Sequence, residues 1–437
     1  PEDYGIFGLS ISIVGVYRLA INFYTEFIIH DQDLLPKELS TFFWVNIIIS
    51  LFLLTVTFCI QEQLSSIGGM PELGKSCLVL ALLISLESIG IQSRIIIAKT
   101  LNFKVYSAIE SISVALSFLV SYIIILKGFS YWGLIFKFSL DILIANCIFI
   151  FWSKWIPKFD FNLSLLSRGL HFSMPLAANS IVMSFSLFAQ NFVINRFLGK
   201  ASLGIFNQAN KIYTISLQSV VYPIGRFAFP YLSEKRENKE TYKREYLYLC
   251  KTMSIIALPL AFFIITFPRE TVLLILGKNW LEVVPVLKAF SIVLLANCFL
   301  HTHRWLFLSL GNTSRMFFMA FIKTFLYLAL IIATVNKGLI AVAYALSFAE
   351  FILLVPFILV AKKGTDISLI EIGRSQLVGF LSAFASLILP LLLWLLLSQK
   401  SMTIFVSTIL PFYLICYLLA LKYFKVFEFL KGKKAQN

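Results

Sequence analysis

Residues 377–397 read LVGFLSAFASLILPLLLWLLL, without a single charged side chain. About 20 consecutive apolar residues are needed for a helix to cross the hydrocarbon core of a bilayer, which is roughly 30 Å thick. Because lipid offers no hydrogen bonds, a spanning segment of this kind satisfies its own backbone amides as a helix. This stretch therefore predicts a transmembrane helix, and the same pattern recurs along most of the chain.

Apolar segments joined by short charged connections make up the rest of the sequence. Hydrophobic residues account for 59% of the 437 residues and charged residues for 14%, with a mean hydropathy of +0.87. A soluble domain carries about 25% charged residues. We predict an all-α, polytopic membrane protein with thirteen transmembrane helices. The expected spans are 5–29, 38–60, 76–97, 104–126, 131–152, 171–198, 202–233, 247–268, 284–309, 315–334, 338–361, 376–398 and 402–424.

Lysine and arginine are distributed unevenly between the two sets of alternate loops. Of the 37 Lys and Arg residues, one side of the membrane holds 21 and the other side holds 8. The positive-inside rule makes the richer side cytoplasmic, which places Pro1 outside and Asn437 inside. The net charge of +15 thus reflects topology, and no nucleic-acid partner is expected. An odd number of spans with an external, Met-less start predicts one lost N-terminal helix and 14 helices in the intact protein.

Motifs for catalysis or metal binding are weak. Gly69–Ser76 matches the pattern GxxxxGK[ST], but it lies in an external turn between two spans and not after a strand of an α/β sheet. The six cysteines lie in or beside apolar spans without metal-binding spacing, and we interpret them as small buried hydrophobic side chains. The intramembrane acids form no catalytic pair. We predict no enzyme activity, no metal and no cofactor.

Polar and charged side chains inside the predicted spans give the functional signal. Such groups are costly in lipid and by default face a bundle interior or a wet cavity. Arg18 and Asn22 share one face of the first span because they are four residues apart. Within 202–233, polar residues recur in a sector of about 120° at 100° per residue. The candidate substrate-binding residues are Arg18, Asn22, Asn179, Gln190, Asn207, Lys211, Gln218 and Arg226.

Structural interpretations of the same charges stay open beside the functional one. Lys137 and Asp141 are four residues apart and would neutralise each other on one helix. Arg226 lies near a span end, from which its side chain would reach the headgroups. Glu110 would serve as a structural partner for a neighbouring helix. Lys323 lies in mid-span without a polar stripe around it.

Several short strings, in a fixed order, carry a family resemblance. They are PEDYG at 1–5, LSTFFWVN at 39–46, NRFLG with LGIF at 195–199 and 203–206, FPYLS at 229–233 and GKNW at 277–280. Over nearly its whole length the sequence resembles the polysaccharide flippases of the multidrug/oligosaccharidyl-lipid/polysaccharide exporter superfamily, close to the branch that serves exopolysaccharides. The resemblance implies two pseudo-symmetric six-helix lobes around a central cavity, plus an extra helix pair. The expected parts are an N-lobe lacking its first helix (1–153), a C-lobe (154–361) and the extra pair with a cytoplasmic tail (362–437).

The resemblance also implies a function. Such a flippase is no enzyme and moves undecaprenyl-diphosphate-linked oligosaccharide repeat units across the bacterial cytoplasmic membrane for surface polysaccharide biosynthesis. Cationic cavity residues in the family are thought to attract the diphosphate, and Arg18 and Lys211 fit that role here. The expected partners are the lipid-linked oligosaccharide and membrane lipids, with a polysaccharide polymerase and chain-length machinery as further candidates.

Three other functions remain as alternatives to this one. A lipid II flippase would also carry a diphosphate-linked cargo. A cation-coupled multidrug exporter of the same superfamily would need a site dominated by carboxylates. A polymerase or ligase of the same pathway would need a long external loop with catalytic residues, and the predicted external connections are short.

Accessibility labelling tests the topology. We expect a tag in the 61–75 turn to react with an impermeant reagent on intact cells, because this turn is predicted to be external. A tag after Asn437 should react only after the membrane is permeabilised. Labelling of the C-terminal tag on intact cells would contradict the positive-inside assignment.

Overall fold

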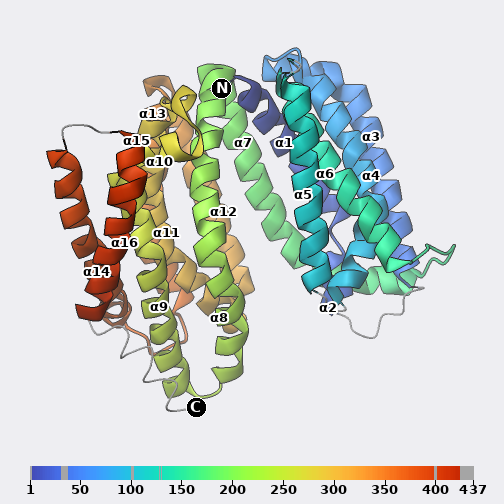
Figure 1. The fold of residues 1–437 in the computed structure, drawn as a ribbon. Coiled ribbons are helices and arrows are strands. Elements are labelled where there is room, and N and C mark those ends of the chain that lie inside the picture. The colour runs from blue at the N-terminus through green and yellow to red at the C-terminus, as the bar shows by residue number, and fades with distance from the viewer. Residues whose placement is uncertain are drawn as a thin grey trace. The chain divides into compact units, whose positions relative to one another are not determined.

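A computed structural model of the protein describes residues 2–30, 38–99, 103–126, 128, 130–397 and 401–423, which form helices and short links without a β-strand (Figure 1). The α-helices are α1 (Glu2–Ile21), α2 (Thr25–His30), α3 (Leu39–Gly68), α4 (Leu73–Lys99), α5 (Phe103–Leu126), α6 (Ser130–Ser153), α7 (Leu163–Ser216), α8 (Tyr222–Lys235), α9 (Lys239–Thr266), α10 (Pro268–Ile275), α11 (Val283–Ser309), α12 (Thr313–Thr334), α13 (Leu339–Ala361), α14 (Leu369–Leu396), α15 (Met402–Ile404) and α16 (Leu410–Tyr423). Short π- or 3-10 helices lie at Leu217–Val221, Lys278–Trp280, Val335–Lys337 and Phe405–Ile409. The predicted all-helical membrane architecture is confirmed.

Within the described residues, eleven helices are long and apolar enough to cross a membrane. The number becomes twelve if the bent pair Val283–Asn297 and Phe299–Ser309 forms one span. The sequence predicted two spans, at 171–198 and 202–233. The structure counts one candidate span at Ser180–Ser219, although the backbone is not helical at Gly199, between the two predicted spans. The predicted count of thirteen is therefore not confirmed.

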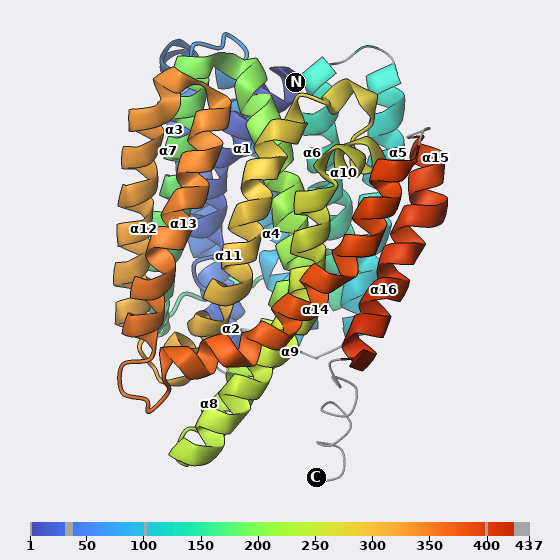
Figure 2. The same cartoon turned by 90° about the vertical axis from the view of Figure 1, so that its left-hand side faces the viewer.

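The chain divides into two compact units, Pro1–Gly204 (unit 1) and Ile205–Asn437 (unit 2), and the boundary falls inside α7. In unit 1, α4 lies against α1, α3 and α6, and α5 packs along α6 (Figure 1). In unit 2, α9 packs against α11 and α14, α13 packs against α11 and α12, and α16 lies beside α14 (Figure 2). Helix α4 is thus the centre of unit 1.

Two predicted spans are interrupted. The span expected at 5–29 ends as α1 at Ile21, and a turn at residues 22–24 separates it from α2. Helix α7 is broken at Gly199, whose φ of 80° and ψ of 170° suit a residue without a Cβ atom. The helix after this break changes to a π-helix at Leu217–Val221. A π-helical turn holds an extra residue, so the polar sector computed for a continuous α-helix does not extend past Val221.

The cysteine interpretation needs a correction. Cys77, Cys250 and Cys416 are buried as predicted, but Cys59 and Cys147 are exposed. The side chain of Cys298 lies outside the described part of the structure. In a membrane an apolar side chain is stable on the surface because it meets lipid there, so an apolar setting in the sequence does not by itself predict burial.

The connection between α6 and α7 is fixed to the start of α3. The indole Nε1 of Trp44 donates to the carbonyl oxygen of Lys158 at 2.9 Å, and the Trp44 ring stacks on Phe159 with 4.8 Å between centroids. The hydroxyls of Ser40 and Thr41 accept hydrogen bonds from the backbone amides of Lys158 and Asn162. The string at 39–46 therefore holds residues 154–162 along the end of a helix.

Helix α16 supplies a hydrogen bond that a proline removes from α9. Pro259 has no N–H group, so the carbonyl of Ile255 loses its usual helical donor. The hydroxyl of Tyr417 donates to this carbonyl, and the hydroxyl of Tyr413 donates to the carbonyl of Pro259 at 2.8 Å. An unpaired carbonyl is costly in lipid, so these bonds attach α16 to α9.

Removing one hydroxyl tests this attachment. We expect Tyr417→Phe to destabilise the protein by about 1 kcal/mol, the size of an interhelical hydrogen bond in a membrane protein. Tyr344→Phe is the control, because Tyr344 is an exposed ring on α13. Thermal unfolding of the purified protein in detergent measures both variants. Equal melting temperatures for the two variants would mean that the Tyr417 hydroxyl contributes nothing.

Candidate functional site

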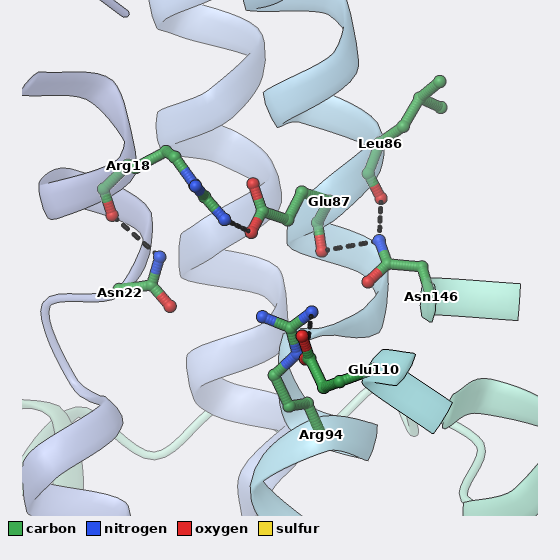
Figure 3. Close-up of polar contacts among 7 residues, drawn as sticks. All are labelled: Arg18, Asn22, Leu86, Glu87, Arg94, Glu110 and Asn146. Atoms are coloured by element: carbon green, nitrogen blue, oxygen red, sulfur yellow. Dashed lines mark hydrogen bonds and ion pairs between the residues drawn. The ribbon is translucent and has the colours of Figure 1, made fainter. Parts of the chain in front are cut away.

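In unit 1, two ion pairs connect α4 to its neighbouring helices α1 and α5 (Figure 3). Glu87 and Arg94 are seven residues apart on α4, so they lie on the same face. Nη2 of Arg18 on α1 lies 2.5 Å from Oε1 of Glu87, and Nη2 of Arg94 lies 3.2 Å from Oε1 of Glu110 on α5. Helix α4 thus carries both an acid and a base, and each is neutralised by a different neighbouring helix.

The Arg18–Glu87 pair is unequally buried. The Glu87 side chain is 3% exposed, whereas the Arg18 side chain is 37% exposed. The Arg18 guanidinium carbon lies 5.6 Å from the centroid of the Phe138 ring, which covers part of it. A lone carboxylate in such a setting would be very costly, so Arg18 stabilises it. The exposed part of the pair therefore belongs to Arg18.

The backbone of α4 at Glu87 is held in place by α6. Nδ2 of Asn146 donates to the carbonyl oxygens of Leu86 and Glu87, each at 3.1 Å (Figure 3). This close approach is possible because residue 90 is glycine, since a Cβ atom there would lie 2.5 Å from the Asn146 side chain. Gly90 and Asn146 together fix where Glu87 lies.

A second buried carboxylate lies in unit 2. Glu350 on α13 is 1% exposed, and its Oε1 lies 2.5 Å from Nζ of Lys323 on α12. The hydroxyl of Tyr327 donates to the same oxygen. The Lys323 ammonium also lies 5.2 Å from the centroid of the Tyr327 ring. Lys323, which has no polar stripe in the sequence, is therefore held by a residue of the next helix.

The sequence-predicted site residues fall into separate places. In unit 1, Arg18 pairs with Glu87, Asn22 donates to the carbonyl of Arg18 at 2.8 Å, and Gln190 donates to Ser186 at 3.0 Å. Arg18 and Asn22 are thus brought together at the end of α1. The side-chain amide of Asn22 is engaged in this hydrogen bond with the backbone of α1.

The remaining candidates lie on α7, on the π-helix that follows it and on α8. Lys211 is exposed on α7, and Gln218 is exposed on the π-helix. Asn207 is half-buried, and its Nδ2 has no hydrogen-bond partner among the described residues. The side chains of Asn179 and Arg226 lie outside the described part of the structure.

Glu87 is the residue that the sequence candidates miss. It stands out in the sequence only as an acid within an apolar span, the same signal that marks Arg18. Two opposite charges on different spans, both in mid-membrane, are candidates for pairing because each stabilises the other in lipid. That rule marks Glu87 and Glu350 as candidates for pairing with a cation, but the partner of each is known only from the fold.

A many-span helical fold with paired charges inside its spans is typical of membrane transporters. A family model described as "Polysaccharide biosynthesis protein" matches residues 1–285, and the chain belongs to this family. The chain is a multi-pass protein of a bacterial cytoplasmic membrane, and its predicted kinship with polysaccharide flippases is confirmed.

Two relatives support the family assignment, and one solved structure shares the fold. The teichuronic acid biosynthesis protein TuaB of Bacillus subtilis (strain 168) is 24% identical over 322 residues, 72% of this chain and 66% of TuaB. The succinoglycan biosynthesis transport protein ExoT of Rhizobium meliloti (strain 1021) is 22% identical over 288 residues, 66% of this chain and 58% of ExoT. The chain thus spans less than two thirds of the length of these relatives. The lipid II flippase MurJ, in an inward closed conformation, superimposes with a TM-score of 0.73 at 16% identity, covering 96% of this chain and 92% of MurJ. This likeness shows a common fold.

Filling the space at Gly90 tests the position of Glu87. We expect Gly90→Ala to destabilise the protein by about 1–3 kcal/mol, because the added methyl group overlaps Asn146. Gly373→Ala is the matched control on α14, since a Cβ atom there meets nothing within 4 Å. Thermal unfolding of both purified variants measures the difference. A Gly90→Ala protein as stable as the control would mean that α4 and α6 are not held this closely.

Proposed function

We propose that the protein is a flippase that moves undecaprenyl-diphosphate-linked oligosaccharide repeat units across the cytoplasmic membrane for surface polysaccharide biosynthesis. It acts by alternating access and performs no covalent chemistry. The names of TuaB, a teichuronic acid biosynthesis protein, and of ExoT, a succinoglycan biosynthesis transport protein, support this cargo class. A polysaccharide polymerase and chain-length machinery are the proposed partners downstream.

One observation carries this proposal: the cation of the Arg18–Glu87 pair is partly exposed, at 37%, and the carboxylate is buried, at 3%. A membrane cation that is accessible on one side attracts a phosphate group, because the surrounding dielectric is lower than that of water. A cation-coupled drug exporter would need the opposite arrangement, with accessible carboxylates. The polarity of the pair therefore favours an anionic cargo, and a lipid II flippase remains the second candidate since its cargo carries the same diphosphate.

The remaining candidate residues belong to the same proposal. We assign Asn179, Gln190, Asn207, Gln218 and Arg226 to the substrate path together with Arg18, Asn22 and Lys211. The proposed architecture has thirteen spans in this chain and fourteen in the intact protein, arranged as two pseudo-symmetric lobes (1–153 and 154–361) and an extra helix pair with its tail (362–437). The superposition with MurJ, which covers 96% of the chain, supports the general architecture.

Charge reversal at Lys211 tests the cationic path. Lys211 is exposed on α7, so its substitution changes the charge of a side chain outside the packed core. We expect Lys211→Arg to retain partial export, because a diffuse polyanion needs attraction more than one fixed geometry. Lys211→Ala should lower surface polysaccharide, and Lys211→Glu should abolish it.

Complementation of a flippase-deficient host by the full-length protein measures this series. Surface polysaccharide and membrane abundance are scored together, so that a loss of protein is not mistaken for a loss of transport. Normal export by Lys211→Glu would remove this residue from the substrate path. Failure of the unaltered protein to complement any polysaccharide-flippase deficiency would contradict the function itself.

A further inference from the structure

We infer that Glu87 is a resident counter-ion that weakens the hold of Arg18 on the anionic headgroup of the cargo, so that the cargo can leave. This inference rests on the proposed function and concerns the same site. It assigns a positioning role to Glu87, which acts on the cargo only through Arg18. The evidence is the geometry of three side chains, Arg18 on α1, Glu87 on α4 and Asn146 on α6 (Figure 3).

Arg18 has donor capacity left after it binds Glu87. A guanidinium carries five N–H donors in a planar fork. Within the described residues, Glu87 takes one of these contacts through Oε1, and the side chain of Arg18 remains 37% exposed. The exposed part can meet the oxygens of a phosphate group while the other edge still contacts Glu87.

The Glu87 side chain itself cannot move together with the cargo. Its side chain is 3% exposed, and the backbone on either side of it is fixed by the two hydrogen bonds from Asn146. Its second oxygen, Oε2, is buried and has no hydrogen-bond partner among the residues that the structure describes. Glu87 therefore depends on Arg18 for its stabilisation.

This dependence gives the pair a restoring effect. When Arg18 turns fully towards a bound diphosphate, it leaves a buried and unpaired carboxylate, which is strongly unfavourable. Arg18 is drawn back to Glu87, and the diphosphate loses its partner. The carboxylate also repels the bound anion directly, because Coulomb repulsion falls only with the first power of distance and is weakly screened inside a protein.

A purely structural role would give a different result. If the pair served only to hold α1 against α4, removing the Glu87 charge would destabilise the fold without strengthening anion binding. Glu87→Gln separates the two roles because glutamine keeps the shape and still offers an oxygen to Arg18, but it carries no charge. We therefore expect Glu87→Gln alone to give tighter anion binding and slower export.

The experiment uses the full-length protein in nanodiscs with inorganic diphosphate as the probe. We expect Glu87→Gln to bind diphosphate about tenfold more tightly than the unaltered protein, equivalent to about 1.4 kcal/mol. Surface polysaccharide in the complementation host should fall several-fold at normal membrane abundance. Glu110→Gln is the control, because Glu110 also pairs with an arginine in unit 1 but is 40% exposed. Its affinity should stay within about twofold, since exposed pairs are well screened.

A double variant keeps the inference testable if Glu87→Gln folds poorly. Arg18→Gln with Glu87→Gln removes both charges and leaves no unpaired ion, so we expect normal abundance, with diphosphate binding and export lost. Unchanged or weaker diphosphate binding by a stable Glu87→Gln protein would overturn the inference, as would retained binding by the double variant. If the unaltered protein bound no diphosphate, the proposed function would fail together with the inference.

Discussion

Water is absent from the hydrocarbon core of a bilayer, and this absence decides where the chain can place a polar group. Each buried carboxylate described above has a cation on an adjacent helix, Arg18 for Glu87 and Lys323 for Glu350. The same requirement explains why Tyr417 donates to the carbonyl that Pro259 leaves without a helical donor. These contacts join helices that apolar packing alone would leave free to slide in lipid.

The need to pair buried charges also decides which member of the Arg18–Glu87 pair is exposed. Both members of a buried pair could in principle be equally hidden, but here the Glu87 side chain is 3% exposed, whereas the Arg18 side chain that reaches it from α1 is 37% exposed. Gly90 makes this arrangement possible because it lets Asn146 approach the helix. A partly exposed guanidinium inside a membrane protein suits a cargo with phosphate groups. Membership of the polysaccharide biosynthesis family fits the same cargo class.

The sequence predicts the apolar spans well because the length and composition of a membrane helix are local properties. It also predicts the contact between Lys137 and Asp141, which the structure confirms at 3.4 Å, since residues four apart on a helix are neighbours. The suggestion that Glu110 serves a neighbouring helix is likewise confirmed by its contact with Arg94. The π-helix at Leu217–Val221 is not foreseen, because such an insertion depends on tertiary packing and has no simple sequence signal. Residues 18 and 87 pair across two helices, so only the fold reveals their contact.

The central claim is that the protein moves a diphosphate-linked oligosaccharide across the membrane. Its most direct test is transport by the purified full-length protein in proteoliposomes, with an undecaprenyl-diphosphate oligosaccharide in the inner leaflet and a lectin outside. We predict that the oligosaccharide becomes accessible to the lectin when the protein is present. An undecaprenol-linked oligosaccharide without phosphate should stay protected. Equal rates for the two lipids, or no movement of the diphosphate form, would contradict the claim.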